Sequence, residues 1–61
     1  MSIVLVLYML VNGALVEQGI RSENGKDYDK FPTMAACEAQ AKKDRDLFKP
    51  DAPVKLVCER R

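Results

Sequence analysis

Histidine and tryptophan are absent from this 61-residue sequence, and two Tyr and two Phe are its only aromatic residues. Without histidine the chain lacks the commonest metal ligand and the usual proton shuttle near neutral pH. The aliphatic hydroxyls, Ser2, Ser22 and Thr33, have no histidine base to activate them. Neither a phosphate-binding loop nor a dinucleotide-binding fingerprint occurs. The sequence therefore predicts a protein that is not an enzyme and has no cofactor, no metal site and no small-molecule substrate.

Excess charge of either sign is also missing. Ten Lys and Arg against nine Asp and Glu give a formal charge of +1. A basic cluster, Lys42, Lys43 and Arg45, alternates with Asp44 and Asp46, a pattern typical of a solvated helix face. We therefore expect no nucleic-acid partner, which would need a basic surface. With 48% hydrophobic residues, three Gly and three Pro, the composition is that of a small globular domain covering residues 1–61.

Residues 3–11 form the longest apolar run, at nine residues. A membrane-spanning helix needs about 20, so no membrane span is expected. The length does match the apolar part of a secretory signal, about 7–15 residues, but no Lys or Arg precedes it. A β-strand is the favoured interpretation, and a signal segment is the alternative.

Asn12-Gly13 between apolar flanks is a strong hairpin signal, because a type I′ turn needs positive φ at both central residues. It predicts strands over residues 3–11 and 14–21, with Val11 opposite Ala14 and Leu7 opposite Gln18. The first strand is apolar on both faces, whereas the second becomes polar away from the turn. We therefore expect the first strand at the centre of the sheet.

The rest of the chain predicts a loop, a helix and a short strand. Residues 22–30 are polar and rich in turn formers, and Thr33 can cap a helix over residues 34–48 that closes before Pro50. Residues 54–59 alternate as a third strand. The predicted fold is α+β: a ββαβ domain whose three-stranded antiparallel sheet has the order 2-1-3, with the helix on one face. Placing the third strand parallel to the second is the alternative, but it leaves the most apolar strand at an edge.

Cys37 falls in the first turns of this helix and Cys58 near the end of the third strand. Because the helix and the strand run in opposite directions, the two cysteines are expected to meet as a disulfide. Such a bond would contribute roughly 3 kcal/mol. Two buried thiols in a reducing compartment are the alternative. A retained Met1 would suit the cytoplasm, whereas a native disulfide would suit the periplasm or secretion.

One helix covers one sheet face, so the other face should be exposed and apolar. Its predicted members form the candidate interaction face: Val4, Val6, Tyr8, Leu10, Leu15 and Val57. Exposed apolar patches of several hundred Å² mark interfaces, and aromatic residues dominate their binding energy, so Tyr8 is the expected anchor. The functional hypothesis is a protein-protein interaction module, a small adaptor or inhibitor, whose partner is another protein or a second copy in a homodimer. The alternative is a secreted or periplasmic structural miniprotein stapled by the disulfide.

No motif in the sequence identifies a family. A hydrophobic hairpin followed by a cysteine-bearing helix and a cysteine-bearing strand is similar in layout to small bacterial and phage proteins. That likeness implies no function.

Overall fold

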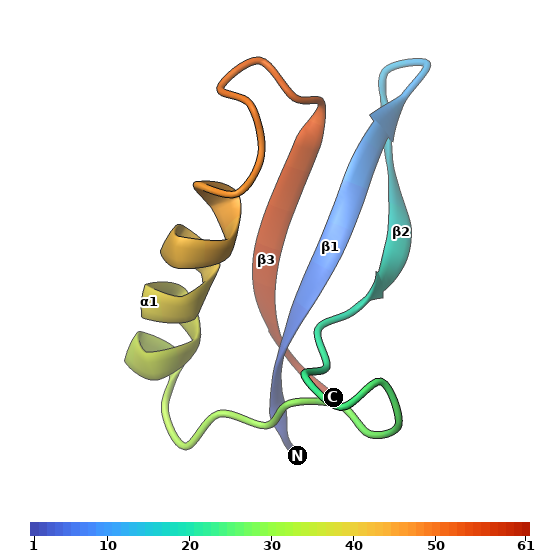
Figure 1. The fold of residues 1–61 in the computed structure, drawn as a ribbon. Helices are drawn as coiled ribbons and strands as arrows, with labels where there is room; N and C mark the ends of the chain where they lie inside the picture. The colour runs from blue at the N-terminus through green and yellow to red at the C-terminus, as the bar shows by residue number, and fades with distance from the viewer.

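The computed structural model describes residues 1–61 as a sheet of three strands with one helix beside it (Figure 1). The elements follow the order β1 (Ile3–Val11), β2 (Ala14–Ile20), α1 (Met34–Arg45) and β3 (Val54–Arg60). All pairings are antiparallel and the sheet order is β2-β1-β3. The predicted ββαβ fold and strand order are thus confirmed, with the apolar strand at the centre.

The hairpin turn forms as predicted, with Asn12 at φ 50° and Gly13 at φ 83°. Val11 lies opposite Ala14, and the predicted register holds as far as Tyr8 opposite Glu17. The next pair differs, because Leu7 lies opposite Gly19 and not Gln18. Gln18 is therefore the extra residue of a β-bulge, a feature that bends and twists an edge strand.

Thr33 caps α1 as expected, since its hydroxyl accepts a hydrogen bond from the Ala36 amide at 3.1 Å. The helix ends at Arg45, three residues before the predicted end at residue 48. The amide of Leu47 reaches back three residues to the Asp44 carbonyl, and that of Phe48 to Arg45. Hydrogen bonds with a three-residue spacing form a tighter turn than an α-helix, whose spacing is four residues, so the α-helix ends here.

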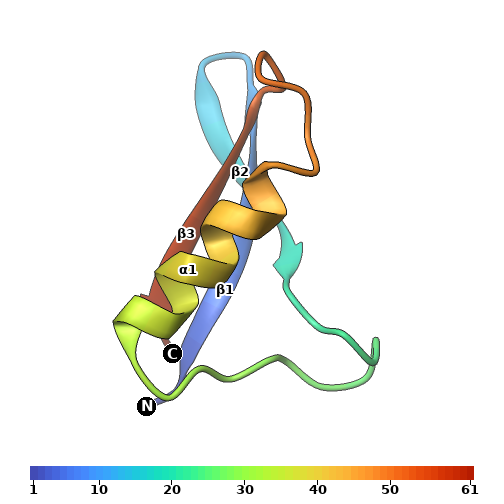
Figure 2. The ribbon, with the colours of Figure 1, turned by 60° about the vertical axis from the view of Figure 1, so that its left-hand side comes forward.

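The fully buried residues gather at one end of the sheet, around Val4, Leu5, Val6 and Cys37. There α1 lies across the face of β1 and β3 (Figure 2). The predicted disulfide is present: Cys37 and Cys58 are bonded, with Cα atoms 6.1 Å apart and a sequence separation of 21. The disulfide fixes the beginning of α1 to the end of β3. It therefore lies at the same end of the sheet as the buried apolar core.

Val4 and Val6 were expected on the exposed face, and this expectation is wrong, because both side chains are buried. Val6 lies between Ile20 on β2 and Val57 on β3. The bulge places Ile20 there, whereas an unbroken register would have put it on the helix side. Beside Val4, the amide of Arg21 binds the Leu5 carbonyl and residues 22–31 return to pair with β1.

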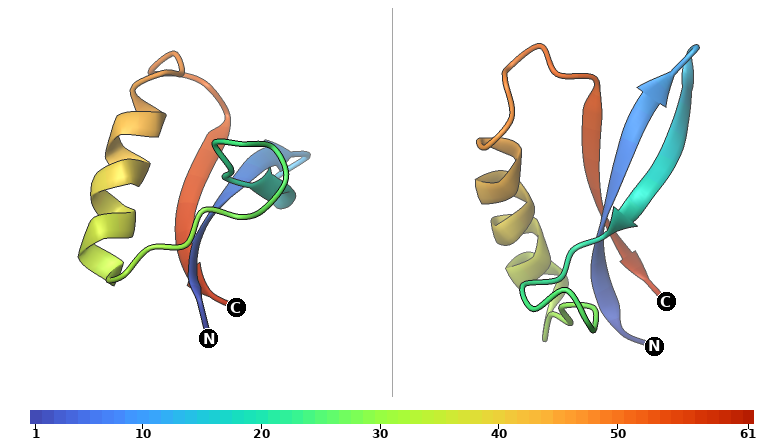
Figure 3. Two further views of the ribbon diagram at one scale, coloured as in Figure 1. Left: turned by 60° about the horizontal axis from the view of Figure 1, so that its bottom comes forward. Right: turned by 45° about the vertical axis from the view of Figure 1, so that its right-hand side comes forward.

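The opposite end of the sheet has no such cover. The β1–β2 hairpin extends away from α1, and its turn lies beyond Met9 and Val54, the last pair of β1 with β3 (Figure 3). No helix in the structure has the length and hydrophobicity needed to span a bilayer.

Candidate interaction site: the hairpin tip and the adjacent groove

The hairpin tip carries apolar side chains on both of its faces. Since side chains alternate along a strand, Met9, Val11 and Val16 point to the helix side, and Leu10 and Leu15 point to the open side. All five are between 37% and 49% exposed. A two-stranded ribbon with two exposed apolar faces is marginal by itself in water. The fold therefore leaves apolar side chains partly uncovered on both faces of the hairpin tip.

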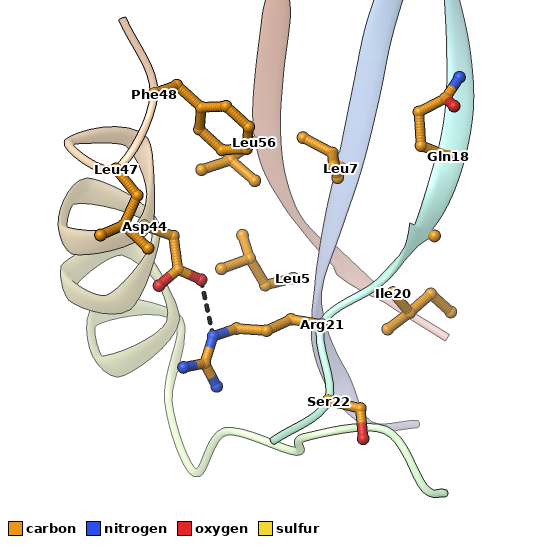
Figure 4. A pocket seen from close by; sticks show the side chains of 11 residues that line it. Leu5, Leu7, Gln18, Ile20, Arg21, Ser22, Asp44, Leu47, Phe48 and Leu56 are labelled. Carbon is orange, nitrogen blue, oxygen red and sulfur yellow. Dashed lines mark hydrogen bonds and ion pairs between the residues drawn. The ribbon is translucent and has the colours of Figure 1, made fainter. Parts of the chain in front are cut away.

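A groove of about 390 Å³ lies on the helix side, between the chain that follows α1 and the sheet (Figure 4). Its apolar lining comes from separate elements, with Leu5 and Leu7 on β1, Leu56 on β3, and Leu47 and Phe48 after α1. Leu47 is 83% exposed at its rim. The volume lies within the range of ligand pockets, about 300–1,000 Å³.

One end of this groove is polar and carries an ion pair. Arg21 Nε donates to Asp44 Oδ2 at 2.6 Å, and its other nitrogens reach Asp29 and Glu23. Burial alone would lower the pKa of the Arg21 guanidinium, but the hydrogen bond to Asp44 and the charges of Asp44 and Asp29 outweigh it and raise that pKa. With three carboxylates around it, Arg21 has its charge fully countered. It serves to tie β2 and residues 22–31 to α1 and offers no free cation to an anionic ligand.

The open face is interrupted by a second polar cluster. The Tyr8 hydroxyl donates a hydrogen bond to the Glu59 carboxylate, and Arg61 binds both Glu59, at 3.1 Å, and Glu17, at 2.5 Å. The hydrogen bond from Tyr8 lowers the pKa of Glu59, and the same bond raises the pKa of Tyr8. Arg61 lowers the pKa of Glu17 through its hydrogen bond. One hydrogen bond and two ion pairs therefore link the three strands across the middle of the face that was predicted to be exposed and apolar.

The outer edge of β2 is unpaired, and it runs along the hairpin tip. The amide of Leu10 donates to the Pro53 carbonyl at 2.8 Å, so Leu10 turns its backbone groups toward β3. Backbone direction alternates along a strand, and Tyr8 therefore does the same. Their partners on β2, Leu15 and Glu17, consequently direct their N–H and C=O groups away from β1 and into solvent.

The predicted interaction face is thus divided by the structure. Val4 and Val6 belong to the core, Val57 is partly buried, and the Tyr8 hydroxyl is bound by Glu59. Leu10 and Leu15 remain half-exposed. Whether Tyr8 anchors a partner stays a prediction.

The helix-side surface was missed by the sequence argument, which assumed that α1 covers the whole of that face. The groove residues that went unrecognised are Leu7, Leu47, Phe48 and Leu56. One signal could have pointed to them: a helix of 12 residues, about three turns, is shorter than a nine-residue strand, so it cannot cover both ends of the sheet.

The predicted basic cluster on α1 consists of two exposed side chains and one that has a structural role. Lys42 and Lys43 are exposed, whereas the Arg45 guanidinium donates to the carbonyls of Lys49 and Pro50 and so holds the turn after the helix.

No protein-family model, curated protein or solved structure matches this chain.

Proposed function

We propose that this protein is a non-enzymatic protein-protein interaction module that receives an extended, apolar segment of a partner chain along the free edge of β2. The observation that carries the proposal is the hairpin tip. Five large apolar side chains, on both faces of one ribbon, are half-exposed directly beside unpaired backbone groups.

An extended segment is the partner chemistry that fits this surface. Its backbone would satisfy the N–H and C=O groups of Leu15 and Glu17, which gives affinity in strand addition. Its side chains would alternate between the two faces of the sheet. One set would cover Leu15 on the open side, and the other would cover Val16 and reach toward the groove.

The disulfide favours a second candidate function. Disulfides persist in oxidising compartments, and a stapled domain of this size suits a secreted or periplasmic structural miniprotein. Thiol labelling of the protein in its native cells separates the two candidates in part, because free Cys37 and Cys58 would argue against the structural role.

The interaction hypothesis can be tested with a peptide library. A library of extended octapeptides with alternating apolar residues would be titrated into isotope-labelled protein, and amide NMR shifts would be recorded. We expect binding peptides to shift the amides of Leu15 and Glu17 most. Shifts confined to residues 22–30, or no binding by any peptide, would contradict the hypothesis.

A matched pair of variants isolates the backbone contribution. Leu15→Pro removes an N–H that points into solvent, and an edge strand tolerates proline at such a position. Leu15→Ala removes the same side chain and retains the N–H. We expect Leu15→Ala to keep most of the peptide affinity and Leu15→Pro to weaken it about tenfold or more. Equal affinities of the two variants would exclude strand addition.

A further inference from the structure

We propose that the segment received by β2 is the β2 strand of a second copy of this chain, paired antiparallel about a two-fold axis at Val16. This inference rests on the proposed function and names its partner. Two three-stranded sheets would then form one continuous sheet, with the two β2 strands at its centre.

The unpaired backbone groups of β2 are arranged symmetrically about Val16. Leu15 and Glu17 flank Val16 at equal spacing, and both point their N–H and C=O groups outward. In the antiparallel pair, Leu15 of each copy exchanges two hydrogen bonds with Glu17 of the other copy. All the outward groups between the turn and the bulge are satisfied, and the arrangement is self-complementary, as a two-fold interface requires.

The charges on β2 do not oppose pairing with a second copy. Edge strands are usually guarded against pairing by lysine, by proline or by an unpaired inward charge. β2 contains no Lys, Arg or Pro, and its one charged residue, Glu17, is bound by Arg61 of its own chain. The pairing sets Glu17 opposite Leu15, so the two carboxylates do not face each other.

The free edge of β2 is regular over a short stretch and is not covered by α1. The turn at Asn12-Gly13 limits the regular stretch of β2 on one side and the bulge at Gln18 limits it on the other. With the axis at Val16, Leu15 and Glu17 both fall within this regular stretch, and Ala14 lies opposite Gln18 of the second copy, where the regular pairing ends. α1 lies on the β3 side of the sheet, so it does not obstruct this edge (Figure 3).

The side chains at the two-fold axis are also compatible with this pairing. Val16 would lie opposite Val16 of the second copy as a non-hydrogen-bonded pair, whose Cα atoms are about 4.5 Å apart. Met9, which lies opposite Val16 on β1, extends this apolar contact on the helix side. So short a contact buries less than a standard interface, and we expect a dissociation constant of roughly 10 μM to 1 mM.

A cysteine cross-link tests this geometry. Val16→Cys places two thiols at the axis, within the Cα separation that a disulfide needs. Val11→Cys is the matched control, because Val11 is the same residue type, lies on the same face and is equally exposed, but belongs to β1. Under mild oxidation we expect Val16→Cys to form a covalent dimer joined at residue 16, identified by peptide mass mapping, and Val11→Cys to form little. Equal cross-linking of both variants, or none of Val16→Cys, would overturn the proposal.

The wild-type protein supplies a second measurement. Sedimentation equilibrium should show a monomer-dimer equilibrium, and hydrogen exchange at the amides of Leu15 and Glu17 should slow as concentration rises. Val16→Lys, which sets two like charges opposite each other, should weaken the dimer about tenfold or more. A protein that stays monomeric at about 1 mM, with fast exchange at both amides, would overturn self-pairing.

The failures of the two proposals are distinguishable. If the dimer is absent while octapeptides still shift the amides of Leu15 and Glu17, only the choice of partner is wrong. If neither the peptides nor a second copy affects these amides, strand addition itself is wrong.

Discussion

Tyr8 and Glu59 lie on adjacent strands, and the hydroxyl of Tyr8 donates a hydrogen bond to the carboxylate of Glu59. This bond joins the central strand to β3 on the face that α1 leaves open. Arg61 extends it to Glu17 on β2. The link depends on a neutral phenol and an ionised carboxylate, which makes it sensitive to pH at both ends of the scale.

Stability should therefore fall in acid, and Tyr8→Phe should reduce that fall. The pKa of Glu59 is lowered in the folded protein, mainly by the hydrogen bond from Tyr8, so its contribution exists above the unfolded pKa of about 4.3 and is lost as pH decreases through the folded value. Urea unfolding at a series of acidic pH values measures the effect, with Tyr28→Phe as the control. An identical pH dependence in Tyr8→Phe and Tyr28→Phe would contradict the role of this hydrogen bond.

The loss of this hydrogen bond at alkaline pH can be followed through the ionisation of Tyr8 itself. The pKa of Tyr8 is raised in the folded protein, mainly by Glu59, so the corresponding stability is present below about pH 10 and is lost as pH increases through the folded value. In a Tyr28→Phe background, the ultraviolet absorbance of tyrosinate reports Tyr8 alone. We expect Glu59→Gln to lower its titration midpoint, because the carboxylate acceptor and its charge are removed. A midpoint that does not move would show that Glu59 is not the cause.

The disulfide should supply a large part of the stability. Closing a loop of 21 residues is worth about 3 kcal/mol in a chain whose total stability is about 3–9 kcal/mol. We expect the double variant Cys37→Ala, Cys58→Ala to lose about 2–4 kcal/mol in urea unfolding. Wild-type protein under reducing conditions is the control, since it loses the cross-link and keeps both sulfur atoms. A loss below about 1 kcal/mol in both samples would mean that packing alone holds α1 on the sheet.

Truncation of leucine should destabilise the protein far more at Leu5 than at Leu10, near the other end of β1. Leu5 is fully buried, and Leu5→Ala should cost about 2–5 kcal/mol, through lost burial and the cavity it leaves. Leu10, half-exposed at the hairpin tip, is its matched control, and Leu10→Ala should cost less than about 1 kcal/mol. Similar losses for the two variants would mean that the hairpin tip is covered in solution.

Deletion of Gln18 should remove the bulge without moving the pairs on either side of it. Leu7 would remain opposite Gly19 and Tyr8 opposite Glu17, now as consecutive pairs. Because bulges discourage edge pairing, the straightened β2 should associate more strongly than the wild-type strand. Sedimentation equilibrium measures this, and an unchanged or weakened association would show that the bulge does not limit the edge.

Local chemistry was sufficient to predict most of the fold. Asn12-Gly13 specified its turn, Thr33 specified the beginning of α1, and the antiparallel course of α1 and β3 brought Cys37 to Cys58. Each of these features depends on a few neighbouring residues and on chain direction.

The exposed surface could not be predicted with the same success, because it depends on a single extra residue. Gly19 inside the second strand is a sequence signal for a bulge, but it does not say which residue is extra. The bulge at Gln18 moves Ile20 to the open face, where it helps to bury Val6. The cluster of Tyr8, Glu59, Arg61 and Glu17 joins residues far apart in sequence and forms only once the register is set. Errors in register propagate to every side chain beyond them.

The bond between Cys37 and Cys58 also determines what a protease can do to this protein. It makes the chain between them a covalent ring that contains most of α1, the exposed turn at residues 46–53 and most of β3. A single cut in that turn opens the ring but releases no fragment, and the mass rises only by one water molecule. The hairpin and its free edge lie outside the ring, so a nicked molecule would keep the proposed binding surface on an uncut β1–β2 hairpin.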